Sequence, residues 1–167
     1  IVLSTGAQAI RPNIEGINSS RILTLRNISD TDKIKEYTDK KEVTSAAVIG
    51  GGYVGVEMAE NLIERGLKVS LVEAAPHILA PFDSDISVLL EKKLTSNGIE
   101  LVLNDGVKAF KDNDTNVDII LNSGKIVTSD LIILAIGVTP DTGFLKDTEI
   151  KLGARGHILV NDRMETS

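Results

Sequence analysis

The sequence predicts an α/β fold in which a parallel sheet carries helices and an antiparallel meander. Two short, wholly apolar runs, 46–49 and 131–135, are typical of parallel strands that are buried on both faces. Apolar residues recur at helical spacing from Tyr53 to about Arg65, directly after the first of these runs. Polar and apolar residues alternate over 107–128, as they do in antiparallel strands.

Composition excludes several classes of function. The 167 residues, 42% of them hydrophobic, are enough for one domain with a core. A net charge of −6 leaves no basic surface for nucleic acid or anionic lipid. No apolar run approaches the roughly 20 residues of a membrane span, and no secretion signal opens the chain. We therefore expect a cytoplasmic protein that binds neither nucleic acid nor membrane.

Cysteine and histidine content limits the chemistry that the chain can perform. There is no cysteine, and the only two histidines, His77 and His157, are far apart in the sequence. This composition excludes disulfides, thiol chemistry and a clustered zinc site. We expect no metal site and no catalytic residue, so any redox chemistry must belong to a cofactor.

The first elements can be assigned in chain order. A capping cluster at 29–32 precedes a polar stretch with helical spacing, which predicts a short amphipathic helix over 33–41. The apolar run at 46–49 is the first strand of the main sheet. The amphipathic helix over 53–65 follows it, and 68–73 is the second strand.

Turn-forming and capping residues delimit the later elements. The remaining expected elements are a helix begun by Asp83 or Ser84 and ended at 97–98, a strand at 99–103, the meander over 107–128 with its turn at 122–124, the strand at 131–135, and a turn at 153–156 between short strands.

A glycine-rich motif lies where the first main strand passes into its helix. Gly50, Gly52 and Gly55 occupy the three glycine positions of G-x-G-x-x-G. The first permits a tight turn, the second lets the backbone approach a pyrophosphate, and the third lets the helix pack closely on its strand. Unpaired N–H groups at the helix start favour an anion. The motif predicts a Rossmann-like dinucleotide site that includes Gly50, Gly51, Gly52, Tyr53, Val54 and Gly55.

Glu73 ends the second strand about 20 residues after the glycines, the spacing at which an acid accepts hydrogen bonds from the adenine ribose. A 2′-phosphate would meet a like charge at this position. The following Ala74-Ala75-Pro76 offers no arginine to offset that repulsion. We therefore expect NAD(H) to bind in preference to NADP(H).

Three further residues are candidates with plain alternative interpretations. Gly137 follows the last central strand, at the carboxyl edge where open α/β sheets bind ligands, but Gly and Pro also mark ordinary turns. Tyr53 and Glu57 lie one helical turn apart and face a common side. They are either site residues or an exposed aromatic ring and a solvated acid.

These motifs resemble the pyridine nucleotide-disulfide oxidoreductase family, in its branch of NADH oxidases, NADH peroxidases and coenzyme A-disulfide reductases. The resemblance covers nearly the whole chain, and Val54 in place of isoleucine is a minor departure. The segments that carry it are Ser4-Thr5-Gly6-Ala7, the glycine signature over 50–60, Ala135-Ile136-Gly137-Val138-Thr139-Pro140-Asp141, and Arg155-Gly156-His157-Ile158-Leu159-Val160-Asn161 with Thr166-Ser167.

The resemblance implies a place within a larger protein. In this family the NAD domain is inserted into a flavin domain, so 1–28 would be a linker from the flavin domain with its lead-in, 29–145 the NAD(H)-binding domain, and 146–167 the return segment. The parent would bind FAD and form a homodimer. Because the flavin-binding segments and the redox-active cysteine would lie outside this chain, the isolated domain is predicted to be inactive.

The resemblance also implies roles for the candidate residues. NADH would lie along the carboxyl edge of the sheet and transfer a hydride to the flavin, in an enzyme of the NADH oxidase or coenzyme A-disulfide reductase type. Tyr53 would cover the nicotinamide pocket, Glu57 would help to organise it, and Gly137 becomes a site residue. Two alternatives stay open: a non-catalytic NAD-sensing regulatory domain, and a flavin instead of NAD on the glycine loop.

Overall fold

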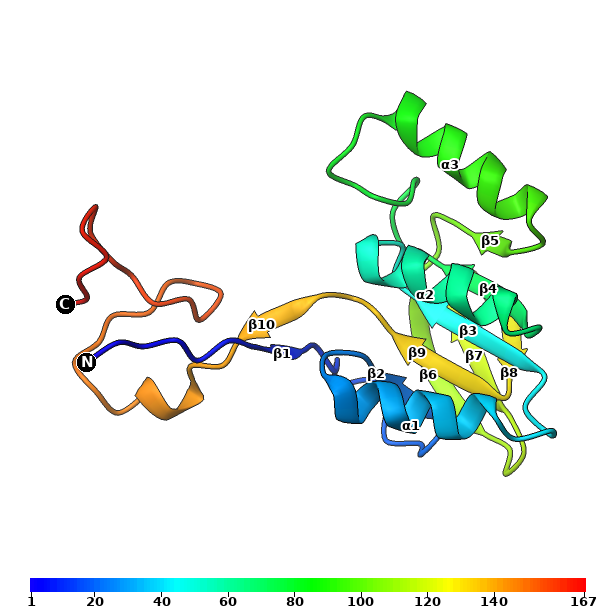
Figure 1. Cartoon of the computed structure of the whole chain (residues 1–167), viewed down its shortest axis with the longest axis horizontal. Helices are drawn as coiled ribbons and strands as arrows, with labels where there is room; N and C mark the ends of the chain where they lie inside the picture. Colours follow the sequence, from blue (N-terminus) through cyan, green and yellow to red (C-terminus); the bar gives the residue numbers. More distant parts are fainter. The chain divides into compact units, whose positions relative to one another are not determined.

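The computed structural model describes residues 1–167, which fold as two units. The larger unit is Arg11–Ile136, and the smaller unit combines Ile1–Ile10 with Gly137–Ser167. Figure 1 follows the chain from its N-terminal segment through the larger unit to the C-terminal segment.

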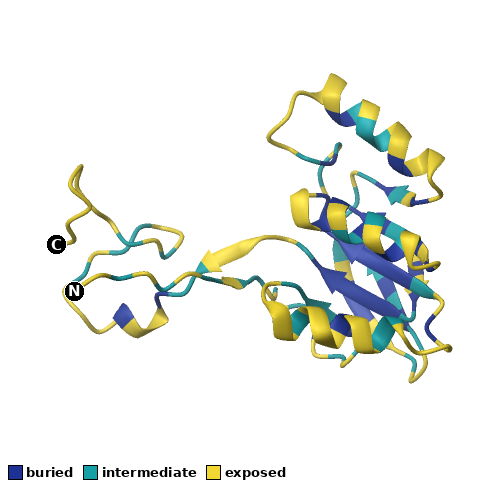
Figure 2. Ribbon diagram, in the orientation of Figure 1, coloured by how far each residue is buried: buried dark blue, intermediate teal, exposed yellow.

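A five-stranded parallel sheet forms the centre of the larger unit, in the order β2-β9-β3-β4-β5. From β3 the chain adds β4 and β5 on one side, and β9 and β2 complete the other side. Strands β3 and β9 are the most deeply buried (Figure 2): after Ser45, every residue of β3 is apolar and buried, and so is every residue of β9. The five strands are β2 (Ile22–Thr24), β3 (Ser45–Ile49), β4 (Lys68–Val72), β5 (Glu100–Val102) and β9 (Leu131–Leu134).

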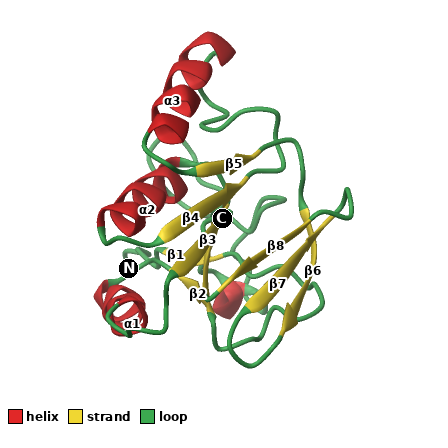
Figure 3. Ribbon diagram, turned by 90° about the vertical axis from the view of Figure 1, so that its right-hand side faces the viewer, coloured by secondary structure: helices red, strands yellow, loops and turns green.

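Alternate residues of each strand enter two different cores, because successive side chains of a strand point to opposite faces. Val48 and Ile133 pack in the core under the helices, whereas Ile49 and Leu134 pack in the core under the meander. The helices lie on one face of the sheet and the meander on the other (Figure 3). The helices are α1 (Ile28–Thr38), α2 (Tyr53–Glu64) and α3 (Ser84–Ser96).

The antiparallel meander replaces a crossover helix between β5 and β9. Its strands are β6 (Val107–Asp112), β7 (Val117–Leu121) and β8 (Ile126–Ser129), paired in that order. Gly124, with φ +89°, makes the β7–β8 turn, and its N–H donates to the carbonyl of Leu121. The predicted α/β fold with a parallel sheet and a meander is confirmed.

The smaller unit is built on two short antiparallel strands, β1 (Ala7–Ala9) and β10 (Val138–Pro140), followed by the 3₁₀ turn Gly143–Leu145. A single antiparallel bridge between Leu152 and Ile158 closes the predicted turn at 153–156.

Three local expectations differ from the structure. Helix α1 begins at Ile28 and ends at Thr38, not over 33–41, because the Asn27 side chain accepts a hydrogen bond from the N–H of Asp30 and caps the helix early. Strand β2 was not predicted, since its three residues carry no periodic signal. Strand β10 falls in the segment that the sequence favoured as a turn.

Two general features of the structure bear on function. None of the helices combines the length and apolar character that crossing a bilayer requires. Nowhere do three or more His, Cys, Asp or Glu side chains gather as they would around a metal ion.

Candidate functional site

The glycine loop lies where the order of strands reverses. Gly50 follows β3, and Ala135 follows the neighbouring strand β9. The N–H of Ala135 donates to the carbonyl of Ile49, at the end of β3, over 2.7 Å. From β3 the chain continues to β4 on one side, whereas β9 pairs with the other side of β3. The carboxyl ends of the strands at such a point are the usual ligand position in open α/β sheets.

Two of the three motif glycines are required by packing. Gly50 has φ +108°, and a Cβ at this position would lie 2.5 Å from the carbonyl oxygen of Ala135. A Cβ on Gly55 would overlap the carbonyl oxygen of Gly50. These glycines therefore let β3, α2 and the residues after β9 approach closely at one point.

Gly52 is not explained by packing. It has an ordinary φ of −76°, and a Cβ built on it would have no heavy atom within 4 Å. As the N-cap of α2 it has no side chain with which to cap the helix, and the N–H groups of Gly52, Tyr53 and Val54 have no partner within the chain. Three free donors at a helix N-terminus form a surface suited to an anion.

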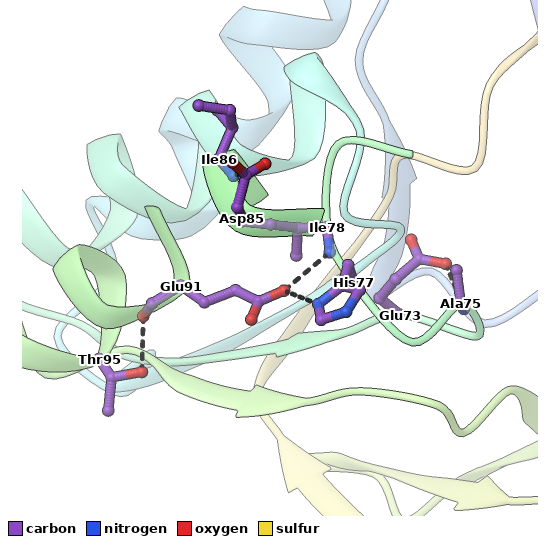
Figure 4. Close-up of polar contacts among 8 residues, drawn as sticks. All are labelled: Glu73, Ala75, His77, Ile78, Asp85, Ile86, Glu91 and Thr95. Carbon is purple, nitrogen blue, oxygen red and sulfur yellow. Dashed lines mark hydrogen bonds and ion pairs between the residues drawn. The ribbon is translucent and has the colours of Figure 1, made fainter. Parts of the chain in front are cut away.

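The carboxylate of Glu73 lies beside this loop. One oxygen accepts a hydrogen bond of 2.6 Å from the N–H of Gly51, and the other accepts one of 2.7 Å from the N–H of Ala75 (the latter pair is drawn in Figure 4). A carboxylate oxygen has capacity for a second hydrogen bond. Glu73 is therefore held in one orientation while it can still accept hydrogen bonds from a diol.

The segment after Glu73 packs back onto the loop. Ile78 is fully buried, and its Cγ2 leaves no room for a side chain on Gly51, since a Cβ there would be 2.7 Å away. Leu79 adopts φ +51°, and its N–H donates to the carbonyl of Gly51 over 2.7 Å. Gly51 is thus fixed by Glu73 on its N–H and by Leu79 on its carbonyl.

The remaining predicted site residues are less constrained. Tyr53 is 57% exposed and meets Phe82 edge to face, with ring centroids 6.1 Å apart. Val54 and Glu57 are also exposed, and no side-chain contact joins Glu57 to another predicted residue. Gly137 belongs to the smaller unit, where it has φ +105° and its carbonyl accepts a hydrogen bond from Ile10.

The amino-terminal edge of the sheet contains none of the predicted residues. Asp130, before β9, accepts four hydrogen bonds from the backbone and hydroxyl groups of Thr44 and Ser45, before and at the start of β3. Burial raises the pKa of Asp130, but these hydrogen bonds together outweigh it and hold the pKa below its usual value. Asp130 therefore ties the two central strands together at the edge opposite the loop.

A cavity of about 340 Å³ also lies near the amino-terminal edge, and its lining mixes charges of both signs. Its lining residues are Ser20, Arg21, Tyr37, Lys40, Glu42, Val43, Asp112 and Asp114.

Comparison with known proteins places the chain in a family. The family model of the pyridine nucleotide-disulphide oxidoreductases matches residues 1–167, which is the whole chain. The chain belongs to this family. Its oxidoreductase relatives include coenzyme A disulfide reductase from Staphylococcus aureus (strain Newman), which is 36% identical over 167 residues. The match covers 100% of this chain and 36% of that protein, so the chain spans about a third of the relative.

Solved structures of oxidoreductases agree with this family assignment. Reduced CoADR-RHD from Bacillus anthracis is 44% identical, with a TM-score of 0.89 over 96% of this chain and 29% of the other. The water-forming NADH oxidase from Lactobacillus brevis bound to NADH is 30% identical, with a TM-score of 0.87 over 96% of this chain and 35% of the other. The predicted family is confirmed, and the alternative of an NAD-sensing regulatory domain receives no support from these oxidoreductase relatives.

Sequence reasoning missed the contacts that fix the loop from the side of α3. Nothing in the pattern distinguishes Ile78 and Leu79 from other residues of an irregular segment. A positive φ at a non-glycine residue leaves no compositional signal, and the contact between Ile78 and Gly51 exists only in the folded chain.

Proposed function

We propose that this chain binds NAD(H) at the carboxyl edge of its parallel sheet. The observation that carries the proposal is the proximity of three free backbone donors, at Gly52, Tyr53 and Val54, to the fixed carboxylate of Glu73. The two features match the two polar parts of an adenosine diphosphate: an anionic diphosphate and a ribose diol.

The diphosphate would lie on the loop from Gly50 to Gly55. The open space above Gly52 allows the backbone to approach the phosphate oxygens, and the N-terminus of α2 favours negative charge without a lysine or arginine. The fit therefore rests on a backbone surface that a side chain at Gly52 would obstruct.

The adenine ribose would lie on Glu73, and NADH would bind more tightly than NADPH. Glu73 accepts hydrogen bonds from hydroxyl groups but repels a 2′-phosphate. Ala74 and Ala75 supply no positive charge to offset that repulsion.

The nicotinamide half would extend toward Tyr53 and Glu57 on the exposed side of α2. Bound NADH supplies a hydride, which in the parent protein would pass to FAD. The chain's own residues bind and orient the dinucleotide, and none of them takes part in bond making. We propose that Tyr53 covers the nicotinamide and that Glu57 organises its surroundings.

For the parent we propose an FAD-dependent homodimeric enzyme of the NADH oxidase or coenzyme A-disulfide reductase type. The enzyme type in this proposal is supported by relatives of both names. In the parent, 29–145 would hold NAD(H), while 1–28 and 146–167 would lead to and from the flavin domain.

A binding experiment tests the proposed function. The purified chain is titrated with NADH and, separately, with FAD by calorimetry. We expect one NADH per chain, no stoichiometric flavin and a colourless preparation. A yellow preparation with one flavin per chain would mean that the glycine loop had been assigned to the wrong cofactor.

A further inference from the structure

A carboxylate on α3 contacts the segment that follows Glu73. The side chain of Glu91 is 13% exposed, and one of its oxygens lies 3.2 Å from the N–H of Ile78 and 3.1 Å from Nδ1 of His77. Figure 4 shows Glu91 reaching from the helix to both groups. This oxygen accepts the backbone hydrogen bond of a buried residue, so the contact fixes the position of the segment.

The contact continues to the glycine loop. The side chain of Ile78 packs against Gly51, and the next residue, Leu79, donates its N–H to the Gly51 carbonyl. The N–H of Gly51 in turn donates to Glu73. Glu91 is therefore linked to the proposed ribose-binding carboxylate through three consecutive contacts of the larger unit.

Glu91 is well placed to maintain a conformation that the segment does not favour by itself. Residues 74–82 contain no helix or strand, and Leu79 holds a positive φ that non-glycine residues rarely adopt. Such conformations persist only where surrounding contacts over-determine them. The hydrogen bond from Ile78 to Glu91 lies directly beside this strained residue.

We propose that Glu91 is a positioning residue for the adenosine half of the dinucleotide. It holds 77–79 against Gly51, which keeps the Gly51 N–H directed at Glu73 and orients that carboxylate toward the ribose diol. This inference rests on the proposed NAD(H) site. It adds a specificity determinant on α3 that makes no direct contact with the ribose-binding carboxylate.

A pair of substitutions of matched length tests the role. Glu91→Gln keeps an oxygen that accepts the Ile78 hydrogen bond, whereas Glu91→Met has a similar length and helix propensity but no such acceptor. Asp85→Asn on the same helix is the control, because the Asp85 carboxylate bonds only the N–H of its neighbour Ile86. Dissociation constants for NADH and NADPH are measured with the apparent melting temperature of each variant.

We expect Glu91→Gln and Asp85→Asn to bind NADH within about threefold of the wild type, and Glu91→Met to bind it about tenfold more weakly. Glu91→Met should lose less affinity for NADPH than for NADH, because Glu73 does not favour NADPH binding. The preference of this variant for NADH therefore declines. A folded Glu91→Met variant that binds NADH like the wild type, or that loses equal affinity for both nucleotides, overturns the proposal.

Two further measurements keep the test decisive. If Glu91→Met does not fold, amide hydrogen exchange in the wild type replaces it: NADH must slow exchange at Ile78 and Leu79, and unchanged exchange overturns the role of Glu91. If the wild type itself does not bind NADH, the proposed function fails and this inference fails with it. If the wild type binds NADH and only the Glu91 result is negative, the proposed function stands.

Discussion

The carboxylate of Glu73 and the backbone N–H of Gly51 are joined by a hydrogen bond of 2.6 Å. The bond links the end of β4 to the loop after β3, two points that are 22 positions apart in the sequence. It fixes the carboxylate beside the free donors at the start of α2. The proposed diphosphate and ribose positions are thus set relative to each other before any ligand binds.

The charge of Glu73 should determine which dinucleotide binds. We expect the wild type to prefer NADH over NADPH by at least about tenfold, and Glu73→Gln to reduce that preference because the repulsion of a 2′-phosphate is removed. Calorimetry with both nucleotides measures the ratio. Asp118→Asn, which removes one charge from the meander, should leave the ratio unchanged. A wild type with equal affinities would remove Glu73 from its assigned role.

Two glycines of the same motif should respond differently to alanine. Gly52→Ala places a methyl group in open space, so the fold should survive while NADH binds about tenfold or more weakly. Gly55→Ala forces a methyl group against the Gly50 carbonyl and should destabilise the fold by about 2 kcal/mol or more. Denaturant unfolding and NADH titration separate the two effects.

Gly143→Ala is the matched control for this comparison. Gly143 also has open surroundings and no positive φ, but it lies in the smaller unit. Its substitution should change neither the stability nor NADH affinity appreciably. Unchanged NADH affinity in a folded Gly52→Ala variant would show that the diphosphate does not lie on this loop.

Asp130 should make stability depend on pH in the acid range. Because its pKa is lowered on folding, its ionised form stabilises the protein above the unfolded pKa of about 3.9, and this stabilisation is lost as the pH falls through the lower folded value. Asp130→Asn should cost about 1–2 kcal/mol at pH 7. The difference from wild type should shrink below about pH 3.9.

Chemical unfolding at a series of pH values measures this difference, with Asp85→Asn as the control for the loss of one charge. A constant difference between wild type and Asp130→Asn from pH 7 to pH 3 would show that the four hydrogen bonds of Asp130 do not depend on its ionisation.

Binding and turnover should be separable. With added FAD and an acceptor, this chain alone should consume no NADH, whereas the full-length parent should be active under the same conditions. In the parent, Tyr53→Ala and Glu57→Gln should alter the rate of flavin reduction in stopped-flow measurements more than they alter the melting temperature, since both side chains are exposed. Robust turnover by the chain alone, or unchanged reduction in both variants, would contradict these assignments.

The parts of the fold that the sequence predicted are those with local signals. The apolar run at 46–49, the helix from Tyr53 and the spacing to Glu73 each carry a pattern of their own, and the structure has β3, α2 and β4 at these positions. Strand β2 has three residues at the edge of the sheet, and its position depends on pairing with β9, which lies more than 100 positions later. Such pairing leaves no periodic signal in a short segment.

The candidate site likewise has a part that the sequence predicts, the glycine motif, and a part that it does not predict, the contact from α3. Gly50, Gly52 and Gly55 could be named because the motif is local and each glycine has a distinct physical reason. The contact of Glu91 with Ile78 depends on how α3 packs against an irregular segment. On the sequence alone Glu91 is one acid of a polar helix.

The measurement that tests the central claim most directly is an NMR titration of the isotope-labelled chain with NADH. The backbone amides of Gly52, Tyr53 and Val54 have no partner in the chain, so a diphosphate that binds them should shift their resonances most. We expect smaller shifts at Gly51 and Ala75 beside Glu73, and none at Arg21 and Lys40 in the cavity near the opposite edge. Shifts concentrated at Arg21 and Lys40, with the amides of 51–55 unchanged, would contradict the account.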